Sequence, residues 1–194
     1  MEITIVETAL GHIGLIGDGM GLRSVTHFYP SGDACLSESG SGTDLVVGER
    51  FANLGAQLKR YADGERIEFT DGVYWWTGTE FERGVWLELS RIPWGQVIGY
   101  SDLARSIGNL KAVRAVGGAV GRNPWPVVVP CHRVVGVDGS LVGYGGGLGR
   151  KAELLEIEGH HLDTDRLRLL CCRPKSESLT LDLFPDESFS VSRH

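Results

Sequence analysis

The sequence contains no run of about 18 or more apolar residues, and this absence excludes a membrane-spanning helix. It also lacks the basic start of an export signal, so we expect a cytoplasmic protein. Its four cysteines show none of the spacings of a metal site, which favours a reduced compartment and predicts no bound metal. We likewise expect no cofactor.

An excess of positive charge is also missing, because the formal net charge is -6 at pH 7. This total argues weakly against a nucleic-acid partner, but the charge is unevenly placed. From Arg105 to Arg133 the chain carries five basic residues and no acidic one. A local basic face matters more for phosphate contacts than the net charge does.

The most informative stretch surrounds Cys131. Residues 127–129 are three valines, which predict a short buried strand, and Pro130 should end it because proline has no N–H to donate. Cys131 and His132 follow directly. A free thiol has a pKa of about 8.5 and becomes a good nucleophile when a base or a positive field stabilises the thiolate. The dipeptide alone is more often structural than catalytic.

The pattern of elements predicts an α+β protein with an N-terminal domain (residues 1–76), a C-terminal domain (77–163) and an extension (164–194). Two or three strands should form a small antiparallel sheet within residues 1–30, followed by a polar loop at 37–42. A helix should then end near Ala62, with Gly64 as its stop. Its apolar face is made of Val47, Phe51, Leu54, Leu58 and Tyr61.

In the second domain, Thr79 and Glu82 form a capping box at the start of a helix. The expected buried face of this helix is Phe81, Val85, Trp86 and Leu89. Ser101 should cap a short helix, and the turn Gly108-Asn109 should join it to another helix over residues 111–120. Two short helices joined by a glycine-containing turn indicate a helix-turn-helix.

The outer face of that second helix is unusual, because Arg114, Gly118 and Arg122 follow each other at four-residue spacing. Glycine inside a helix costs about 1 kcal/mol relative to alanine. Close approach to a groove and tight helix packing both explain the small residues, and spacing does not decide between them. The residues beside this stripe are Ala115, Gly117 and Ala119.

After Cys131, Asp138-Gly139 predicts a hairpin turn. Residues 144–147, Tyr-Gly-Gly-Gly, predict a loop whose backbone can approach a ligand closely. A last helix is expected over residues 150–157, just before Glu158.

Residues 81–161 resemble the O6-alkylguanine-DNA alkyltransferases, also called methylated-DNA–protein-cysteine methyltransferases. The motifs occur in the order and at the spacing of that family, without gaps. The Pro-Cys-His-Arg-Val element is highly specific when it occurs together with the other motifs. The resemblance implies a ribonuclease H-like N-terminal domain and a winged helix-turn-helix-like C-terminal domain. The matching stretches are Ile92-Pro93-Trp94-Gly95 with Tyr100, Lys111 to Gly117, Gly121-Arg122-Asn123-Pro124, Pro130-Cys131-His132-Arg133-Val134 and Gly143 to Leu148.

The same resemblance implies a reaction. Cys131, held as an anion at the floor of a cleft, accepts the alkyl group from O6 of guanine and keeps it as a thioether, so each molecule acts once. His132 is the base, linked to the thiol through a water, and Glu158 orients its imidazole.

The implied partner is double-stranded DNA containing O6-alkylguanine, whose target base must leave the stack. Arg114 would take its place, and Tyr100 would contact the 3′ phosphate and protonate the leaving guanine at N3. The DNA-binding face would comprise Arg114, Ala115, Gly118, Tyr100 and Arg122. The pocket would comprise Asn123, Tyr144, Gly145 and the carbonyl groups of Cys131 and Val134.

Some features depart from the family pattern. Gly145 stands where some members have serine, and Cys35 has no second cysteine, so a zinc site with His12 and His27 is not expected. Three other functions stay open: a non-catalytic lesion-binding protein, a cysteine hydrolase and a transcriptional regulator. We expect a monomer.

The extension contains Thr180 to Phe184, which resembles the bacterial sliding-clamp-binding pentapeptide at four of five positions. The alternative is an edge strand or an added helix that packs on the body, because short motifs often match by chance.

Overall fold

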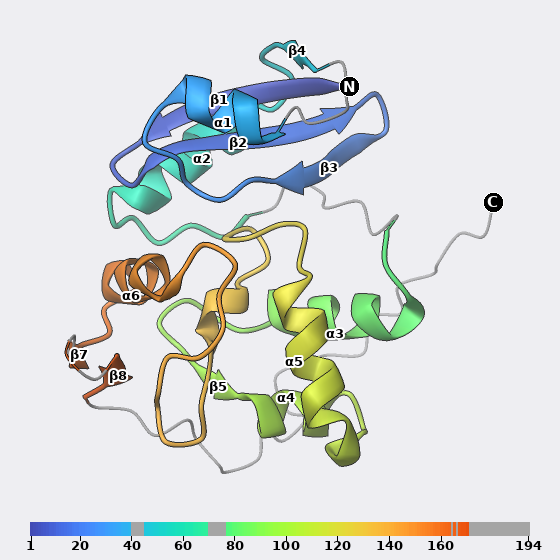
Figure 1. Ribbon diagram of the computed structural model, residues 1–194, viewed down its shortest axis with the longest axis vertical. Helices are drawn as coiled ribbons and strands as arrows, with labels where there is room; N and C mark the ends of the chain where they lie inside the picture. The colour runs from blue at the N-terminus through green and yellow to red at the C-terminus, as the bar shows by residue number, and fades with distance from the viewer. Residues whose placement is uncertain (40–44, 70–76, 164, 166, 171–194) are drawn as a thin grey trace.

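The computed structural model describes residues 1–39, 45–69, 77–163, 165 and 167–170. Within these residues the fold is mixed α+β, with a small sheet lying over a group of helices (Figure 1). The described part of this sheet has the strand order β3-β2-β1-β4. Its strands are β1 (Glu2–Thr8), β2 (Gly11–Asp18), β3 (Gly21–Val25) and β4 (Val46–Val47).

The first two strands form because alternating apolar residues pair across a tight turn, as their sequence predicts. Ile3 pairs with Ile16, and Ile13 and Leu15 are fully buried. The sheet is not purely antiparallel, because β4 runs parallel to β1. A third strand is expected over residues 25–29, whereas β3 covers Gly21–Val25. Beyond Val25, the N–H of Thr26 donates to the carbonyl of Gly14 over 2.9 Å, and an isolated bridge joins Tyr29 to His12.

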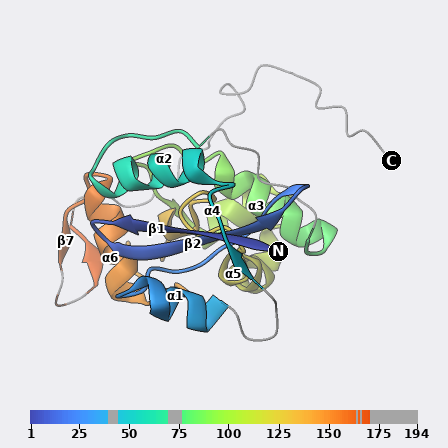
Figure 2. The same cartoon turned by 90° about the horizontal axis from the view of Figure 1, so that it is seen from above.

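Two helices cover opposite faces of the sheet, α1 (Gly32–Ser39) and α2 (Ala52–Ala62) (Figure 2). The predicted loop at 37–42 is wrong for residues 37–39, which end α1, while residues 40–42 lie outside the described part. Ser37 and Ser39 donate their hydroxyl groups back to backbone carbonyls four residues earlier, so polar residues are satisfied inside this helix.

The predicted apolar face of α2 is largely confirmed. Leu54, Leu58 and Tyr61 are buried, and Gly64 ends the helix with a φ of 89°. Val47 is the exception, because it lies in β4 with 60% of its surface exposed.

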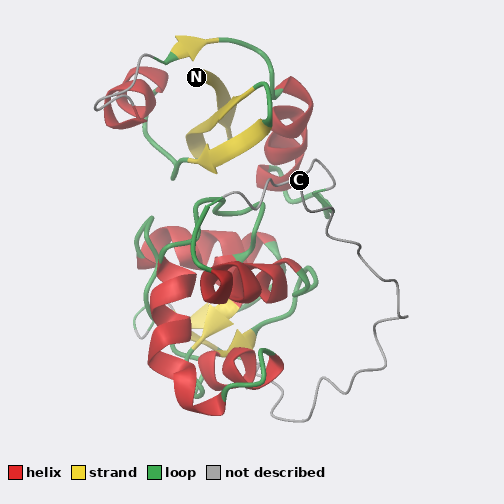
Figure 3. Ribbon diagram, turned by 90° about the vertical axis from the view of Figure 1, so that its right-hand side faces the viewer, coloured by secondary structure: helices red, strands yellow, loops and turns green. Residues whose placement is uncertain are grey.

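The rest of the described chain is mainly helical, and the short β5–β6 pair lies among the helices (Figure 3). Two 3-10 turns, η1 and η2, separate its regular elements. These elements are α3 (Glu80–Ser90), β5 (Ile98–Gly99), α4 (Tyr100–Ser106), η1 (Leu110–Ala112), α5 (Val113–Gly121), η2 (Cys131–Arg133), β6 (Val134–Val135), α6 (Leu148–Ile157), β7 (Leu162–Asp163) and β8 (Arg168–Leu169).

Helix α3 buries three of its four predicted residues, whereas Phe81 is 37% exposed. Trp86 donates its indole N–H to the carbonyl of Ala119 over 2.8 Å, which ties α3 to α5. Ala119 is therefore buried and not part of the outer face. Helix α4 begins one residue before Ser101, with Gly99 as its N-cap, so the predicted cap is also wrong.

The three valines before Pro130 are buried but form a turn instead of a strand. Val127 has a φ of 72°, a left-handed conformation that a β-branched residue rarely adopts. Val129 donates its N–H to the carbonyl of Trp125 over 2.8 Å, which closes the turn. The predicted turn at Asp138-Gly139 does form, but β6 pairs in parallel with β5 and not with a hairpin partner.

The sheet and the helices share one apolar core, in which Ile13, Leu15 and Leu54 cluster with Val85 and Leu103. A backbone hydrogen bond of 2.8 Å from Val25 N–H to the carbonyl of Pro124 joins the end of β3 to the segment before Cys131. None of the helices in the described residues is long and apolar enough to cross a membrane.

The capping box at α3 yields the first prediction. Thr79 Oγ1 accepts from the N–H of Glu82, and Glu82 Oε2 accepts from the N–H of Thr79 over 2.8 Å. Thr79→Ala should lower the free energy of unfolding by about 1 kcal/mol, because it leaves a helix N–H without its partner. Urea unfolding measures the change. Thr79→Ser keeps the hydroxyl and should retain most of the stability; equal losses in both variants would contradict this role.

Candidate active site around Cys131

Cys131 begins the 3-10 turn η2, between the valine turn and β6. Its N–H donates to the carbonyl of Val129 over 2.8 Å, and the N–H of Arg133 donates to the carbonyl of Pro130 over 3.0 Å. This tight backbone buries Cys131, His132 and Arg133 together. Three adjacent side chains that can take part in a reaction are thereby shielded from solvent, although those of His132 and Arg133 are polar.

The sulfur borders a small cavity. The structure brings Asn123, Tyr144 and Gly145 to it, as the resemblance implies, whereas Tyr100 and Val134 are not among its lining residues. The cavity volume is about 20 Å³, which is room for about one water molecule. This cavity is smaller than a purine. The other lining residues are His27, Val120, Gly121, Pro126 and Gly143.

The expectation of a standing thiolate is not met either. Burial raises the pKa of Cys131, although the Asn123 side chain and the charge of Lys151 act in the opposite direction. The thiol is therefore neutral at pH 7 and must lose its proton as it reacts.

The group that can take this proton is His132, which is fully buried. Burial lowers its pKa, so the imidazole is neutral at pH 7. Its Nε2 lies 2.9 Å from Oε1 of Glu158, whereas Nδ1 has no hydrogen-bond partner among the described residues. Because a carboxylate only accepts, Nε2 carries the proton and Nδ1 carries the lone pair. The fold thus brings together two residues that are 26 positions apart.

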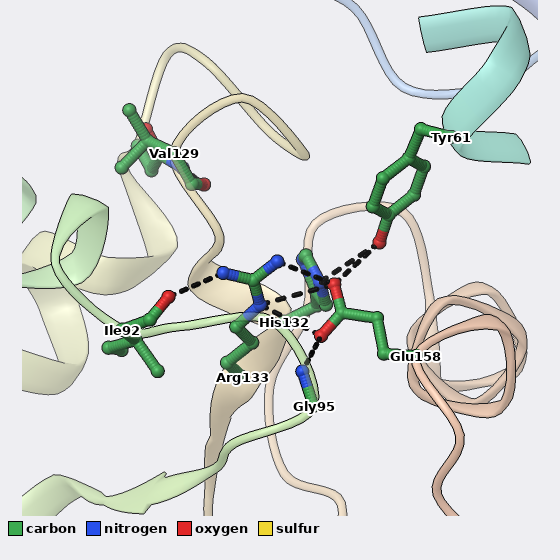
Figure 4. Close-up of polar contacts among 8 residues, drawn as sticks. Tyr61, Ile92, Gly95, Val129, His132, Arg133 and Glu158 are labelled. Carbon is green, nitrogen blue, oxygen red and sulfur yellow. Dashed lines mark hydrogen bonds and ion pairs between the residues drawn. The ribbon is translucent and has the colours of Figure 1, made fainter. Parts of the chain in front are cut away.

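Glu158 lies at the end of α6 and is the centre of the polar network (Figure 4). Arg133 donates to it through Nε over 2.8 Å to Oε2 and through Nη2 over 2.7 Å to Oε1. Tyr61 donates its hydroxyl to Oε1 over 2.8 Å, and the Gly95 N–H lies 3.4 Å from Oε2. Burial alone would raise the pKa of Glu158, but hydrogen bonds and charge from His132 and Arg133 outweigh it and hold the pKa at about 2. Because His132 is neutral, the ion pair here is Glu158 with Arg133.

Three residues of the site were not predicted as functional. Arg133 was considered only as part of the motif and of the basic stretch, and Tyr61 only as a core residue of its helix. Lys151 is fully buried, and its Nζ donates to the carbonyls of Val134 over 2.6 Å and Val142 over 2.8 Å. Burial lowers the pKa of Lys151 to about 8. In the sequence, Lys151 lies next to apolar positions of the predicted last helix. This position was the one local signal that could have indicated its burial.

His27 is a further residue that the sequence did not single out as part of the pocket. Its ring lies edge-on to Tyr144, with 5.5 Å between the ring centroids. A Cβ on Gly145 would lie 2.5 Å from Nε2 of His27, so glycine at this position allows the close approach. The described residues contain no group of three side chains able to hold a metal ion.

The predicted DNA-binding residues occupy different environments. Arg114 and Ala115 are exposed on α5. Arg122 is also exposed, but its Nε donates to Glu82 over 2.5 Å and its guanidinium lies against Gly118. The hydroxyl of Tyr100 donates to the carbonyl of Val142 over 3.3 Å, and burial raises its pKa.

The two carbonyl groups expected to bind the guanine amino group already accept protein hydrogen bonds. The Cys131 carbonyl accepts from the N–H of Val134, and the Val134 carbonyl accepts from Lys151.

A buried cysteine followed in the chain by a buried, neutral histidine is an arrangement that suits a protein with a cysteine nucleophile. Residues 80–160 match the family model described as 6-O-methylguanine DNA methyltransferase, DNA binding domain. The chain belongs to the methylated-DNA–protein-cysteine methyltransferase family, and the recognition from sequence is confirmed.

Relatives with that name support the assignment over most of the chain. The protein from Mycobacterium leprae is 40% identical over 163 residues, covering 82% of this chain and 93% of its own length. The protein from Methanosarcina acetivorans is 41% identical over 159 residues, covering 82% of this chain and 99% of its own. The crystal structure of Mycobacterium tuberculosis OGT in complex with DNA aligns with a TM-score of 0.71 and 36% identity, covering 81% of this chain and 92% of that one.

The network at Glu158 makes stability depend on pH. Its folded pKa, about 2, lies below the ordinary value of 4.5, so its contribution is fully present above pH 4.5 and is lost as the pH falls toward 2. Glu158→Gln should lower the free energy of unfolding by about 3–5 kcal/mol at pH 7, because Arg133 loses its buried counter-charge. The difference in the free energy of unfolding between wild type and this variant should become smaller as the pH falls from 4.5 to 2.

Urea unfolding across this pH range measures the gap. Glu153→Gln is the matched control, since Glu153 is half exposed and pairs with Arg150 at the surface. It should change stability by less than about 1 kcal/mol. A gap for Glu158→Gln that stays constant as the pH falls would contradict the assigned pKa.

Proposed function

We propose that this protein repairs DNA by transferring an alkyl group, such as methyl, from O6-alkylguanine to the sulfur of Cys131. The observation that carries the proposal is a buried cysteine at a cavity, followed in the chain by a buried histidine whose Nε2 is fixed by Glu158. Family membership supports the same reaction. The product is a thioether, so each molecule acts once and carries no cofactor.

The reaction forms a bond from sulfur to the alkyl carbon and breaks the bond from that carbon to O6. The thiol proton passes through a water to Nδ1 of His132, and Glu158 steadies the resulting imidazolium. Guanine leaves with the bonding electrons and takes a proton at N3 from Tyr100. The neutral resting thiol fits this scheme, because deprotonation and alkyl transfer then occur together.

The partner is double-stranded DNA, and the target base reaches the sulfur only after it leaves the stack. Arg114 fills the space that the base leaves, supported by Ala115, Gly118, Arg122 and Tyr100 on the same face. Because the cavity is small, the loop of Gly143 to Gly145 and the His27 side chain must move to admit the base. Tyr144, Asn123 and the carbonyls of Cys131 and Val134 then surround it.

The proposal extends to the domain folds, the oligomeric state and the location of the protein. The sheet with α1 and α2 is a ribonuclease H-like domain over residues 1–76, and residues 77–163 form a winged helix-turn-helix-like domain. The protein acts as a monomer in the cytoplasm. The clamp-binding motif at Thr180 to Phe184 lies outside the described residues and stays a prediction. Of the extension at 164–194, the structure describes residues 165 and 167–170, where β8 pairs with β7.

A non-catalytic lesion-binding protein is the main alternative, and mass spectrometry separates the two. After incubation with DNA containing O6-methylguanine, the peptide with Cys131 should gain the mass of one CH2 group. Cys131→Ser should bind the same DNA with unchanged affinity and gain no mass. An unmodified wild-type peptide at saturating DNA would rule out transfer, and turnover beyond one equivalent would indicate a hydrolase.

The role of Arg114 predicts a difference between two substrates. Arg114→Ala should slow transfer from duplex DNA by about tenfold or more, because the vacated stack loses its replacement at a cost of a few kcal/mol. It should leave transfer from free O6-benzylguanine nearly unchanged, since that substrate needs no extrusion. Lys59→Ala, at an exposed position of α2 outside the basic stretch, is the control and should leave transfer from both substrates unchanged. Equal slowing on both substrates would contradict the flipping role.

A further inference from the structure

Tyr61 connects the N-terminal part of the chain to the network around Cys131. It lies in the last turn of α2 and is fully buried. Its hydroxyl donates to Oε1 of Glu158 over 2.8 Å and lies 3.3 Å from Nε2 of His132 (Figure 4). The residues in contact are 97 and 71 positions away in the sequence. A hydroxyl from the sheet-and-helix part thus completes a relay whose other members come from the helical part.

The hydrogen bonds assign a direction to each proton. Glu158 is ionised and can only accept, so the Tyr61 hydroxyl is the donor to Oε1. The Nε2–H of His132 points at the same oxygen and can be shared with Tyr61 Oη, which has free lone pairs. Tyr61 therefore favours the tautomer in which Nδ1 is unprotonated. Nδ1 is the nitrogen that can act as the base.

The aromatic surroundings hold the Tyr61 ring in place. Trp94 packs edge-on against it at 5.2 Å between centroids, and Phe69 lies at 5.7 Å. Burial raises the pKa of Tyr61, so its hydroxyl stays protonated and remains a donor at any pH where the protein functions. A purely apolar role would be served equally well by phenylalanine, which would leave Glu158 with one donor fewer.

We propose that Tyr61 is a positioning residue for alkyl transfer, which orients the Glu158–His132 pair and holds the imidazole in its basic tautomer. The proposal rests on the proposed function. It gives the N-terminal part of the chain a direct share in thiol activation. Tyr61 does not touch the substrate and acts only through Glu158 and His132.

The test is Tyr61→Phe in the full chain, with the rate of transfer from free O6-benzylguanine measured from pH 5 to 9. We expect a loss of about tenfold at neutral pH, the size of one hydrogen bond to a charged group. Tyr61 donates to the carboxylate that accepts from His132 and shares the His132 Nε2–H, so its loss changes the hydrogen bonding of the imidazole. The acid limb of the rate profile, which reports protonation of His132, should therefore be displaced by about half a pH unit or more.

Tyr29→Phe is the matched control. Tyr29 is partly buried in a separate cluster beside Cys35, so its rate profile should equal that of wild type. If Tyr61→Phe lowers only the thermal stability and leaves the acid limb in place, the residue is structural and the proposal is wrong.

A double variant gives a second readout. If Tyr61 acts through Glu158, then Tyr61→Phe added to Glu158→Gln should slow transfer no further than Glu158→Gln alone. Additive losses would overturn the proposal. Alkylation of Cys131 by iodoacetamide, followed by peptide mass spectrometry, reports thiol activation without any guanine substrate. Suppose that Tyr61→Phe shifts the acid limb of the iodoacetamide reaction, while wild type transfers no alkyl group from O6-benzylguanine. The proposed function would then be wrong, and the role of Tyr61 in thiol activation would stand.

Discussion

The buried carboxylate of Glu158 is the constraint on which the rest of the structure depends. A carboxylate removed from water is costly unless charge and hydrogen bonds replace the lost solvent. Here Arg133 supplies the opposite charge, and Tyr61, His132 and the Gly95 backbone supply further donors. Arg133 is fixed in turn by a hydrogen bond of 2.5 Å to the carbonyl of Ile92. The ends of α2, α3 and α6 must therefore meet at one point. The turn η2, which carries Cys131, lies between them.

Burial also decides the state of the nucleophile. The same packing that excludes water from the network raises the pKa of Cys131 and leaves only a small cavity beside it. A neutral thiol is less reactive toward stray electrophiles than an exposed thiolate. Reactivity then depends on a correctly placed base and on a substrate that enters the cavity, which is lined by His27, Gly143 and Gly145 among others.

Local signals in the sequence predicted the local parts of this structure. The capping box at Thr79 involves residues three positions apart, and the sheet and α2 follow from apolar periodicity. The valines at 127–129 misled, because β-branched residues favour strands while the core burial of this segment imposes a left-handed turn at Val127. The motif around Cys131 identified the family, but it did not predict which side chains surround Glu158 in the folded protein. Contacts such as that of Tyr61 with Glu158 depend on the whole fold, and no local spacing reports them.

The order in which the network's members occur along the chain has a consequence for synthesis. Tyr61 leaves the ribosome early, Cys131 much later, and Glu158 later still, so the carboxylate arrives after the thiol that it serves. Until residue 158 has emerged and α6 has packed, a growing chain carries an unassisted cysteine. The burial that shields the sulfur and the carboxylate that orients its neighbouring imidazole are therefore both complete only after the last of these elements has packed.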